Sequence, residues 1–284
     1  MIKVITRSET SRLSSQGIKA RLSALCITIL LVASGPASAN AKNYGEMVDV
    51  PAGSFIMGCL NSNDDICYYI EDEKSHKVYL DDYKIDKYEV TFARYQKCID
   101  AGKCNDLAIG GSMNFGRKGV ENYPINGVTW HQAKTFCEYE GKRLPTEAEW
   151  EKAARGTDGR KYPPWGNQKP SCELAVMDTQ YAGNLGCGTG NVMNVGSKPK
   201  GASPYGAMDM AGNVWEWTAD WHSTRYYNRS PEKNPQGPSS GVYKTTRGSD
   251  FFARAYWELR STSRFPYYPS NVSPAIGVRC AKSA

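Results

Sequence analysis

The alternation of apolar and polar residues predicts short β-strands at the start of the main body of the chain. Residues 48–58 alternate apolar and small residues around a Pro-Ala-Gly turn, which is typical of a β-hairpin. Residues 76–80 and 83–90 carry a strand pattern and are separated only by Asp81 and Asp82, so they predict a second strand pair. We therefore expect two hairpins in this part of the chain.

Three helices are predicted where the spacing of apolar residues changes to that of a helix. They span residues 91–102, 129–141 and 146–156, and each begins at a threonine and ends at a glycine. In the third helix, Thr146 and Glu149 have the spacing of a capping box, in which each side chain bonds the main chain of the other residue.

The chain beyond residue 156 predicts little regular structure and no helix. It is rich in Gly, Pro, Asn and Ser, with clusters of aromatic residues between them. Disulfides, bound cations and buried Trp would have to order such a chain, because buried irregular backbone needs hydrogen-bond partners. No linker or change of composition divides residues 47–284, so we expect a single domain there.

Residues 1–39 predict a secretory signal peptide. Basic residues end at Arg21, an apolar run follows over residues 22–32, and Ala-Ser-Ala at 37–39 offers a cleavage site. A competing interpretation is an uncleaved membrane anchor, but the run is much shorter than the roughly 20 residues that a bilayer requires. We expect cleavage, residues 40–46 as a short linker, no stable membrane anchor afterwards, and a secreted or periplasmic protein.

Composition and charge exclude two further classes of protein. The 284 residues include 27 Gly, 15 Pro and 18 Tyr, which argues against a long helical bundle or coiled coil. The net charge is +6, but residues 1–39 hold five Lys or Arg and one acid, so about +2 remains for the body. No stripe of Lys and Arg is visible, and we expect no nucleic-acid partner.

The cysteines support export. Of nine, Cys26 lies in the signal segment and eight remain, an even set that suits an oxidising compartment. Free or metal-bound thiols are the alternative, but no C-x-x-C pair is present, so zinc is disfavoured. Short loops suggest three disulfides and leave one long-range pair: Cys59 with Cys67, Cys98 with Cys104, Cys172 with Cys187, and Cys137 with Cys280.

Seven motifs in order resemble the formylglycine-generating enzyme (sulfatase-modifying factor) superfamily, over residues 47–282. The motifs are VPAGSFIMG (50–58), YEVT (88–91), PINGVTW (124–130), GKRLPTEAEWE (141–151), PWGN (164–167), GNVWEW (212–217) and IGVRC (276–280). The resemblance implies a mixed α+β fold with little regular secondary structure, related to C-type lectin domains. It also implies a family disulfide at Cys137 and Cys280.

The family's reference reaction oxidises a sulfatase Cys to formylglycine with O₂ and a copper ion held by two thiolates. The matching stretch here, residues 247–264, contains no Cys, and neither Cys nor Met lies between Thr245 and Cys280. Soft Cu(I) favours thiolate or thioether ligands. We therefore expect no copper and no copper-dependent oxidase, while other catalysis stays open. No iron site is expected either, because the three His (His76, His131, His222) stand in separate motifs.

A family calcium site is implied near GNVWEW. Asp209 and Glu216 would supply carboxylates, and Gly212 and Val214 would supply main-chain carbonyls, a mixture of oxygen ligands that suits Ca²⁺. The alternative is that the two carboxylates only cap turns.

Trp215 and Ser249 match residues that border the family's substrate cleft. Aromatic residues and Arg are dense after Ser249, and we include Trp257 and Arg254 in the expected cleft, since both types concentrate at binding hot spots. They also fill cores, which is the alternative. Glu258 is a weak candidate for an acid or base, with an ion pair to Arg254 or Arg260 as its alternative role.

Three alternative functions follow from these features of the sequence. The first is an exported, non-catalytic or accessory domain, expected to be a monomer, that binds an extracytoplasmic peptide or protein. The second is a periplasmic maturation enzyme of altered, copper-independent chemistry, similar to the superfamily member of pyoverdine maturation. The third, an active sulfatase activator, is disfavoured by the missing thiols.

Overall fold

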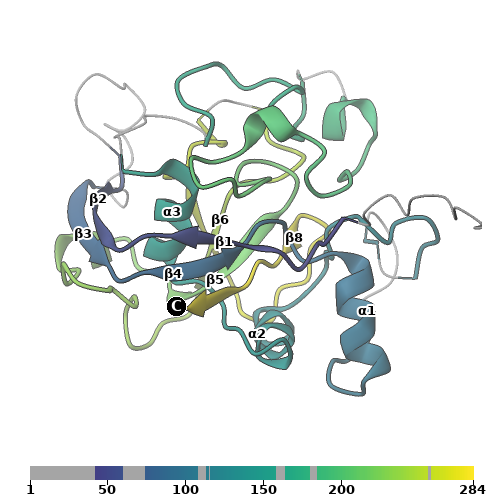
Figure 1. The fold of residues 1–284 in the computed structure, drawn as a ribbon, viewed down its shortest axis with the longest axis horizontal. Helices are drawn as coiled ribbons and strands as arrows, with labels where there is room; N and C mark the ends of the chain where they lie inside the picture. The colour runs from purple at the N-terminus through teal and green to yellow at the C-terminus, as the bar shows by residue number, and fades with distance from the viewer. Residues whose placement is uncertain are drawn as a thin grey trace, which may run out of the picture. The chain divides into compact units, whose positions relative to one another are not determined.

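The computed structural model describes residues 42–59, 74–107, 113–114, 116–157, 164–179, 184–254 and 257–284. The predicted signal peptide, the start of the linker, Cys67 and Tyr256 lie outside these residues. Residues 42–284 form one compact unit of mixed helices and short strands, so the predicted α+β single domain is confirmed (Figure 1).

The first four strands are present, but the predicted hairpin pairing is wrong. They are β1 (Met47–Val50), β2 (Gly53–Met57), β3 (His76–Leu80) and β4 (Tyr83–Asp86). β1 pairs with β4 and β2 with β3, all antiparallel and in one continuous register. Residues 51–52 therefore lie opposite residues 81–82. The chain does not reverse at either pair of residues, and both strands of one long antiparallel pair are interrupted there.

The three predicted helices are confirmed. They are α1 (Phe92–Asp100), α2 (Trp130–Tyr139) and α3 (Glu147–Arg155), capped by Thr91, Thr129 and Thr146. α2 and α3 both have a complete capping box. No helix in the described parts of the chain is long and apolar enough to cross a membrane.

The C-terminal part contains strands that the composition did not predict. They are β5 (Trp215–Trp221), β6 (Lys244–Arg247), β7 (Arg264–Tyr267), β8 (Ile276–Gly277) and β9 (Ala281–Ser283), with 3₁₀ turns at Leu185–Gly188, Pro199–Gly201 and Tyr226–Asn228. One sheet has the order β7-β6-β5-β8, and β9 returns to pair with β4. Strands this short are specified by pairing with distant segments, which local patterns do not reveal.

Every residue of α3 is buried, including its charged ones. Glu147 pairs with Arg247 of β6 and Arg264 of β7, at 3.2 and 2.7 Å. Glu151 pairs with Arg247 at 2.6 Å and with Arg155 at 2.8 Å. The helix is therefore tied to the four-stranded sheet by ion pairs inside the core.

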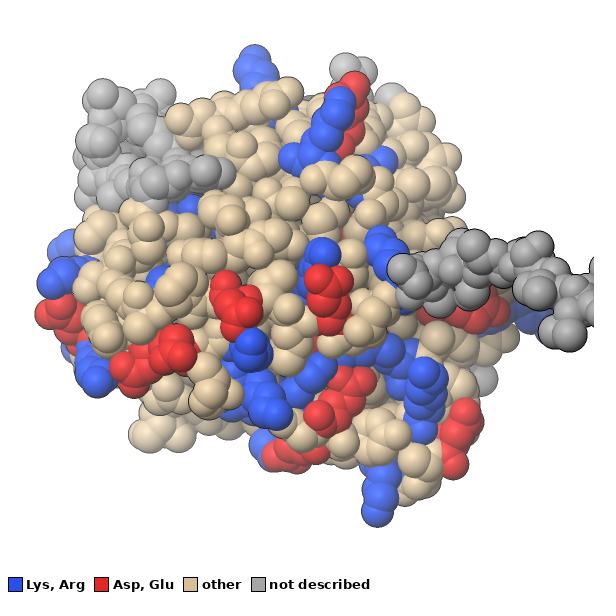
Figure 2. Space-filling view, viewed as in Figure 1, with Lys and Arg blue, Asp and Glu red and all other residues tan. Residues whose placement is uncertain are grey.

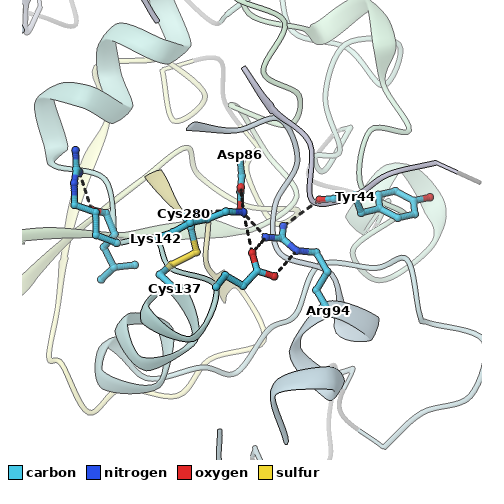
Figure 3. The surroundings of a disulfide bond; sticks show 9 residues. Tyr44, Asp86, Arg94, Cys137, Lys142 and Cys280 are labelled. Carbon is cyan, nitrogen blue, oxygen red and sulfur yellow. Dashed lines mark hydrogen bonds and ion pairs between the residues drawn. A yellow bond between two sulfur atoms is a disulfide. The ribbon is translucent and has the colours of Figure 1, made fainter. Parts of the chain in front are cut away.

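Three predicted disulfides are confirmed: Cys98–Cys104, Cys137–Cys280 and Cys172–Cys187. Cys59 is also disulfide-bonded, and its predicted partner Cys67 lies outside the described residues. Figure 3 shows the Cys137–Cys280 bond beside Asp86. The Asp86 carboxylate forms ion pairs with Arg94 at 2.9 Å and with Lys142 at 2.7 Å. The bond joins α2 to the last segment of the chain.

We expect removal of the Cys137–Cys280 bond to cost more stability than removal of any other single disulfide described. It spans 143 residues, and on the chain-entropy account the double Cys→Ala variant should lose about 5 kcal/mol of unfolding free energy. The matched control removes Cys98–Cys104, which spans 6 residues and should cost about 2 kcal/mol. Urea unfolding measures both, and equal losses would contradict the expectation.

Candidate functional site

A row of aromatic rings lies on one face of the four-stranded sheet. Trp215 and Trp217 of β5 and Phe265 and Tyr267 of β7 form this aromatic face, since residues two apart on a strand share a face. Ring centroids lie 5.9 Å apart for Trp215 and Phe265, 5.0 Å for Phe265 and Tyr267, and 6.2 Å for Trp217 and Tyr267. Trp217 is buried, whereas Phe265 is 47% exposed, so the row runs from core to surface.

Asp250 lies at the open end of the aromatic face. Its carboxylate accepts a hydrogen bond from the Phe252 main-chain N–H at 2.8 Å and another from the Trp215 side chain. Burial raises the pKa of Asp250 to about 7, and repulsion from Glu258 adds to this effect. A carboxyl group with such a pKa can take up or release a proton near neutral pH.

Sequence reasoning missed Asp250. It stood next to Ser249, which was selected from the family resemblance, but a single Asp in a turn carries no signal of its burial. Ser249 itself is only 2% exposed and adopts a left-handed backbone (φ 64°), so it shapes the turn that delivers Asp250.

Glu258, the predicted acid or base, is partly buried and accepts a hydrogen bond from the Arg254 main-chain N–H at 2.8 Å. Its predicted alternative, an ion pair with Arg254 or Arg260, is not found among the described residues. The Arg254 side chain instead pairs with Asp178 at 3.1 Å. Trp257, 42% exposed, lies on the surface of the same segment.

The residues of the predicted calcium site are all buried. Asp209 accepts from the Gly196 main-chain N–H at 2.5 Å, and burial raises its pKa to about 6. Both oxygens of Glu216 bond Arg279, and one also accepts from Trp150 Nε1 at 2.6 Å. A metal ion bound by Glu216 would have to share the carboxylate oxygens with Arg279 and Trp150.

A third carboxylate, Glu89, lies in the same region and was missed, although its motif YEVT was recognised. It accepts from Asn213 Nδ2 at 2.6 Å and from the Val214 N–H at 3.2 Å. Burial raises its pKa well above the usual range, and repulsion from Asp209 and Glu216 adds to this. Three carboxylates near the Arg279 guanidinium form an oxygen-rich group short of positive charge, although the described carboxylates are not arranged as a metal site.

The backbone of this region is closely packed at Gly212. A β-carbon there would lie 2.3 Å from the Val176 carbonyl oxygen, and its φ of 80° is left-handed. The Gly of the GNVWEW motif is therefore required by a close backbone contact.

The described donors do not fit copper. All seven described cysteines that follow the signal segment are in disulfides, so none presents a thiolate. Among the described residues, no group of three or more His, Cys, Asp or Glu is arranged to hold a metal ion.

We expect Asp250→Asn to stabilise the protein at pH 8 but much less at pH 4. The ordinary pKa of Asp is 3.8 and that in the fold is about 7, so the folded state binds the proton more tightly. The free energy of unfolding then falls as the pH rises between these values, by at most about 4 kcal/mol. Urea unfolding of both proteins at the two pH values measures the gain.

The matched control is Asp178→Asn, which removes a buried carboxylate that has an ion-pair partner and should bring no gain at pH 8. If the Asp250→Asn variant and the wild type have the same free energy of unfolding at both pH values, ionised Asp250 does not destabilise the fold.

Comparison with known proteins places the chain in a family. Residues 33–284 match the profile described as "Sulfatase-modifying factor enzyme 1-like domain". The formylglycine-generating enzyme of Mus musculus is 29% identical, covering 83% of this chain and 74% of the relative. Serine/threonine-protein kinase pkn1 of Chlamydia caviae is 32% identical over 84% of this chain, and the chain spans 38% of that kinase's length.

Solved structures share the fold. PvdO from Pseudomonas aeruginosa has a TM-score of 0.69 and 26% identity, covering 86% of this chain and 100% of PvdO. The Treponema denticola variable protein 1, at 22% identity and a TM-score of 0.66, covers 84% of this chain and 95% of its own and shows the fold alone. With its seven motifs, its fold and its profile match, the chain belongs to the formylglycine-generating enzyme (sulfatase-modifying factor) family.

Proposed function

We propose that this protein is an exported, monomeric domain that binds an extracytoplasmic peptide or protein segment at the aromatic face. The observation that carries the proposal is the row of rings that emerges at Phe265 and Trp215 beside the Asp250 carboxyl. Exposed aromatic residues beside a few placed polar groups are typical of recognition sites. Disulfides and the predicted signal peptide support a secreted or periplasmic location.

Copper-dependent formylglycine formation is not part of this proposal. The similar proteins include a formylglycine-generating enzyme, a protein named as a kinase, and PvdO. Membership of the family therefore does not by itself determine the reaction. The donor chemistry supports a function without copper, because the residues that match the family's catalytic segment contain no sulfur and the described cysteines are in disulfides.

A second candidate function is a copper-independent maturation enzyme. Asp250 favours it, because its pKa of about 7 suits general acid–base catalysis at neutral pH. In that function Asp250 would hold or release a proton at its carboxyl oxygen, while the aromatic face would position the substrate. Asp250 then replaces Glu258 as the preferred acid or base.

A nucleic-acid partner is not proposed. Figure 2 shows Lys and Arg interspersed with Asp and Glu on the face it displays, without a stripe of one sign. Such a mixed surface lacks the basic footprint that phosphate backbones require.

We expect Trp215→Ala and Phe265→Ala each to weaken peptide binding at least about fivefold, the loss typical of an aromatic anchor. The probe is a displayed library of random 12-residue peptides selected on the wild-type protein, followed by affinity measurement with synthetic copies. Tyr139→Ala on α2 is the control, because that ring is 40% exposed but lies outside the aromatic face.

Two outcomes would count against this function. If no peptide is selected, or if the selected peptides bind the Trp215→Ala and Phe265→Ala variants as they bind the wild type, the aromatic face is not a peptide site. Mass spectrometry of a C-x-P-x-R peptide incubated with the protein and copper should show no aldehyde, and aldehyde above the no-protein control would restore the oxidase function.

We also propose a structural Ca²⁺ held by Asp209 with the Gly212 and Val214 carbonyls and Glu216. An ion that binds only the folded state raises stability by mass action. We expect the melting temperature to fall when EDTA replaces 1 mM CaCl₂, and Asp209→Asn to remove the difference. Asp106→Asn is the control, and an EDTA-insensitive wild type would leave the carboxylates as turn caps.

A further inference from the structure

The open end of the aromatic face has a local excess of negative charge. Asp250 and Glu258 each accept a main-chain hydrogen bond, at 2.8 Å in both cases, but neither has an ion-pair partner within the part of the chain described. The Arg254 side chain, which lies between them in the sequence, pairs with Asp178 instead. The two carboxylates therefore repel each other without a counter-charge.

This arrangement differs from that of Glu147 and Glu216, although Glu89 and Asp220 are also buried without an ion-pair partner among the described residues. Glu147 is bonded by two guanidinium groups, and Glu216 is bonded by Arg279 through both oxygens. A carboxylate that is taken out of water without a partner destabilises the fold. Asp250 is 9% exposed and has hydrogen-bond donors but no cation among the described residues, which is consistent with a positive charge supplied by a ligand.

The neighbouring rings favour a cation as that ligand group. Trp215 donates a hydrogen bond to Asp250 and its ring packs 5.9 Å from Phe265, so an aromatic surface and a carboxylate meet at one point. Ring faces attract ammonium and guanidinium groups, and carboxylates pair with them directly. The same protein already stacks Lys244 between Trp130 and Trp221, 4.0 Å from each ring centroid.

Recognition here has to use side chains. β7 is the outer strand of its sheet, but Pro266 in its middle has no N–H to offer a further strand. A peptide would thus gain little by extending the sheet and would bind through the groups it presents to the rings and carboxylates.

We infer that the open end of the aromatic face, with Asp250 and Glu258, binds a Lys or Arg side chain of the peptide. This inference rests on the proposed function and adds to it the charge of the residue that is recognised. The carboxylates supply the counter-charge, and the Trp215 and Phe265 rings cover the aliphatic part of the side chain.

The test compares synthetic copies of the selected 12-residue peptides in which each Arg is replaced by citrulline and each Lys by norleucine. One such replacement should weaken binding to the wild type at least about tenfold, as loss of a charge-assisted pair does. When the double variant Asp250→Asn/Glu258→Gln is used in place of the wild type, the same replacement in the peptide should change its affinity less than about twofold. Glu138→Gln, an exposed carboxylate on α2, is the control and should behave as the wild type.

The outcomes separate this inference from the proposed function. Selected peptides that depend on Trp215 but lack basic residues, or bind equally with citrulline, overturn the cation site and leave the peptide site standing. Failure to select any peptide overturns both. Circular dichroism of the double variant checks its fold, and Asp250→Asn alone, expected to be stable, should still lower the citrulline effect at least about threefold.

Discussion

The charge balance around α3 is the constraint on which the rest of the structure depends. Glu147 and Glu151 are buried, and burial alone would raise the pKa of Glu147, yet Arg264 and Arg247 lower it. Loss of one partner of such a pair costs about 3–5 kcal/mol, because the other charge stays buried. Since Arg247 ends β6 and Arg264 begins β7, these ion pairs link the helix to both strands.

The candidate site follows directly from this arrangement. The chain leaves β6 at Arg247, turns through the left-handed Ser249 and presents Asp250 to the Trp215 side chain. The ion pairs of α3 therefore position the strand ends from which the site is built. The buried Glu147 and Glu151 are compensated by Arg side chains, whereas Asp250 and Glu258 have no ion-pair partner among the described residues, and such departures from local rules are typical of functional sites.

The helices, their caps and the disulfides were predictable because their signals are local or countable. Thr146 and Glu149 lie three residues apart, and the loops closed by Cys98–Cys104 and Cys172–Cys187 are short. The strand pairing was not predictable, because Pro51 and Asp81 look alike as turn residues whether the chain reverses or both strands bend at the same point. Only the continuous register of β1–β2 against β3–β4 distinguishes the two.

The sequence by itself determined the family, the α+β class, the three helices and the absence of thiols from residues 247–264, since motifs and residue identities are readable without contacts. By resemblance it also predicted that Trp215 and Ser249 border a cleft. Only the tertiary structure decided that Asp250 is the carboxyl with a pKa near 7 and that Glu216 is the partner of Arg279. Burial and charge pairing arise between segments far apart in the chain, so no local pattern contains them.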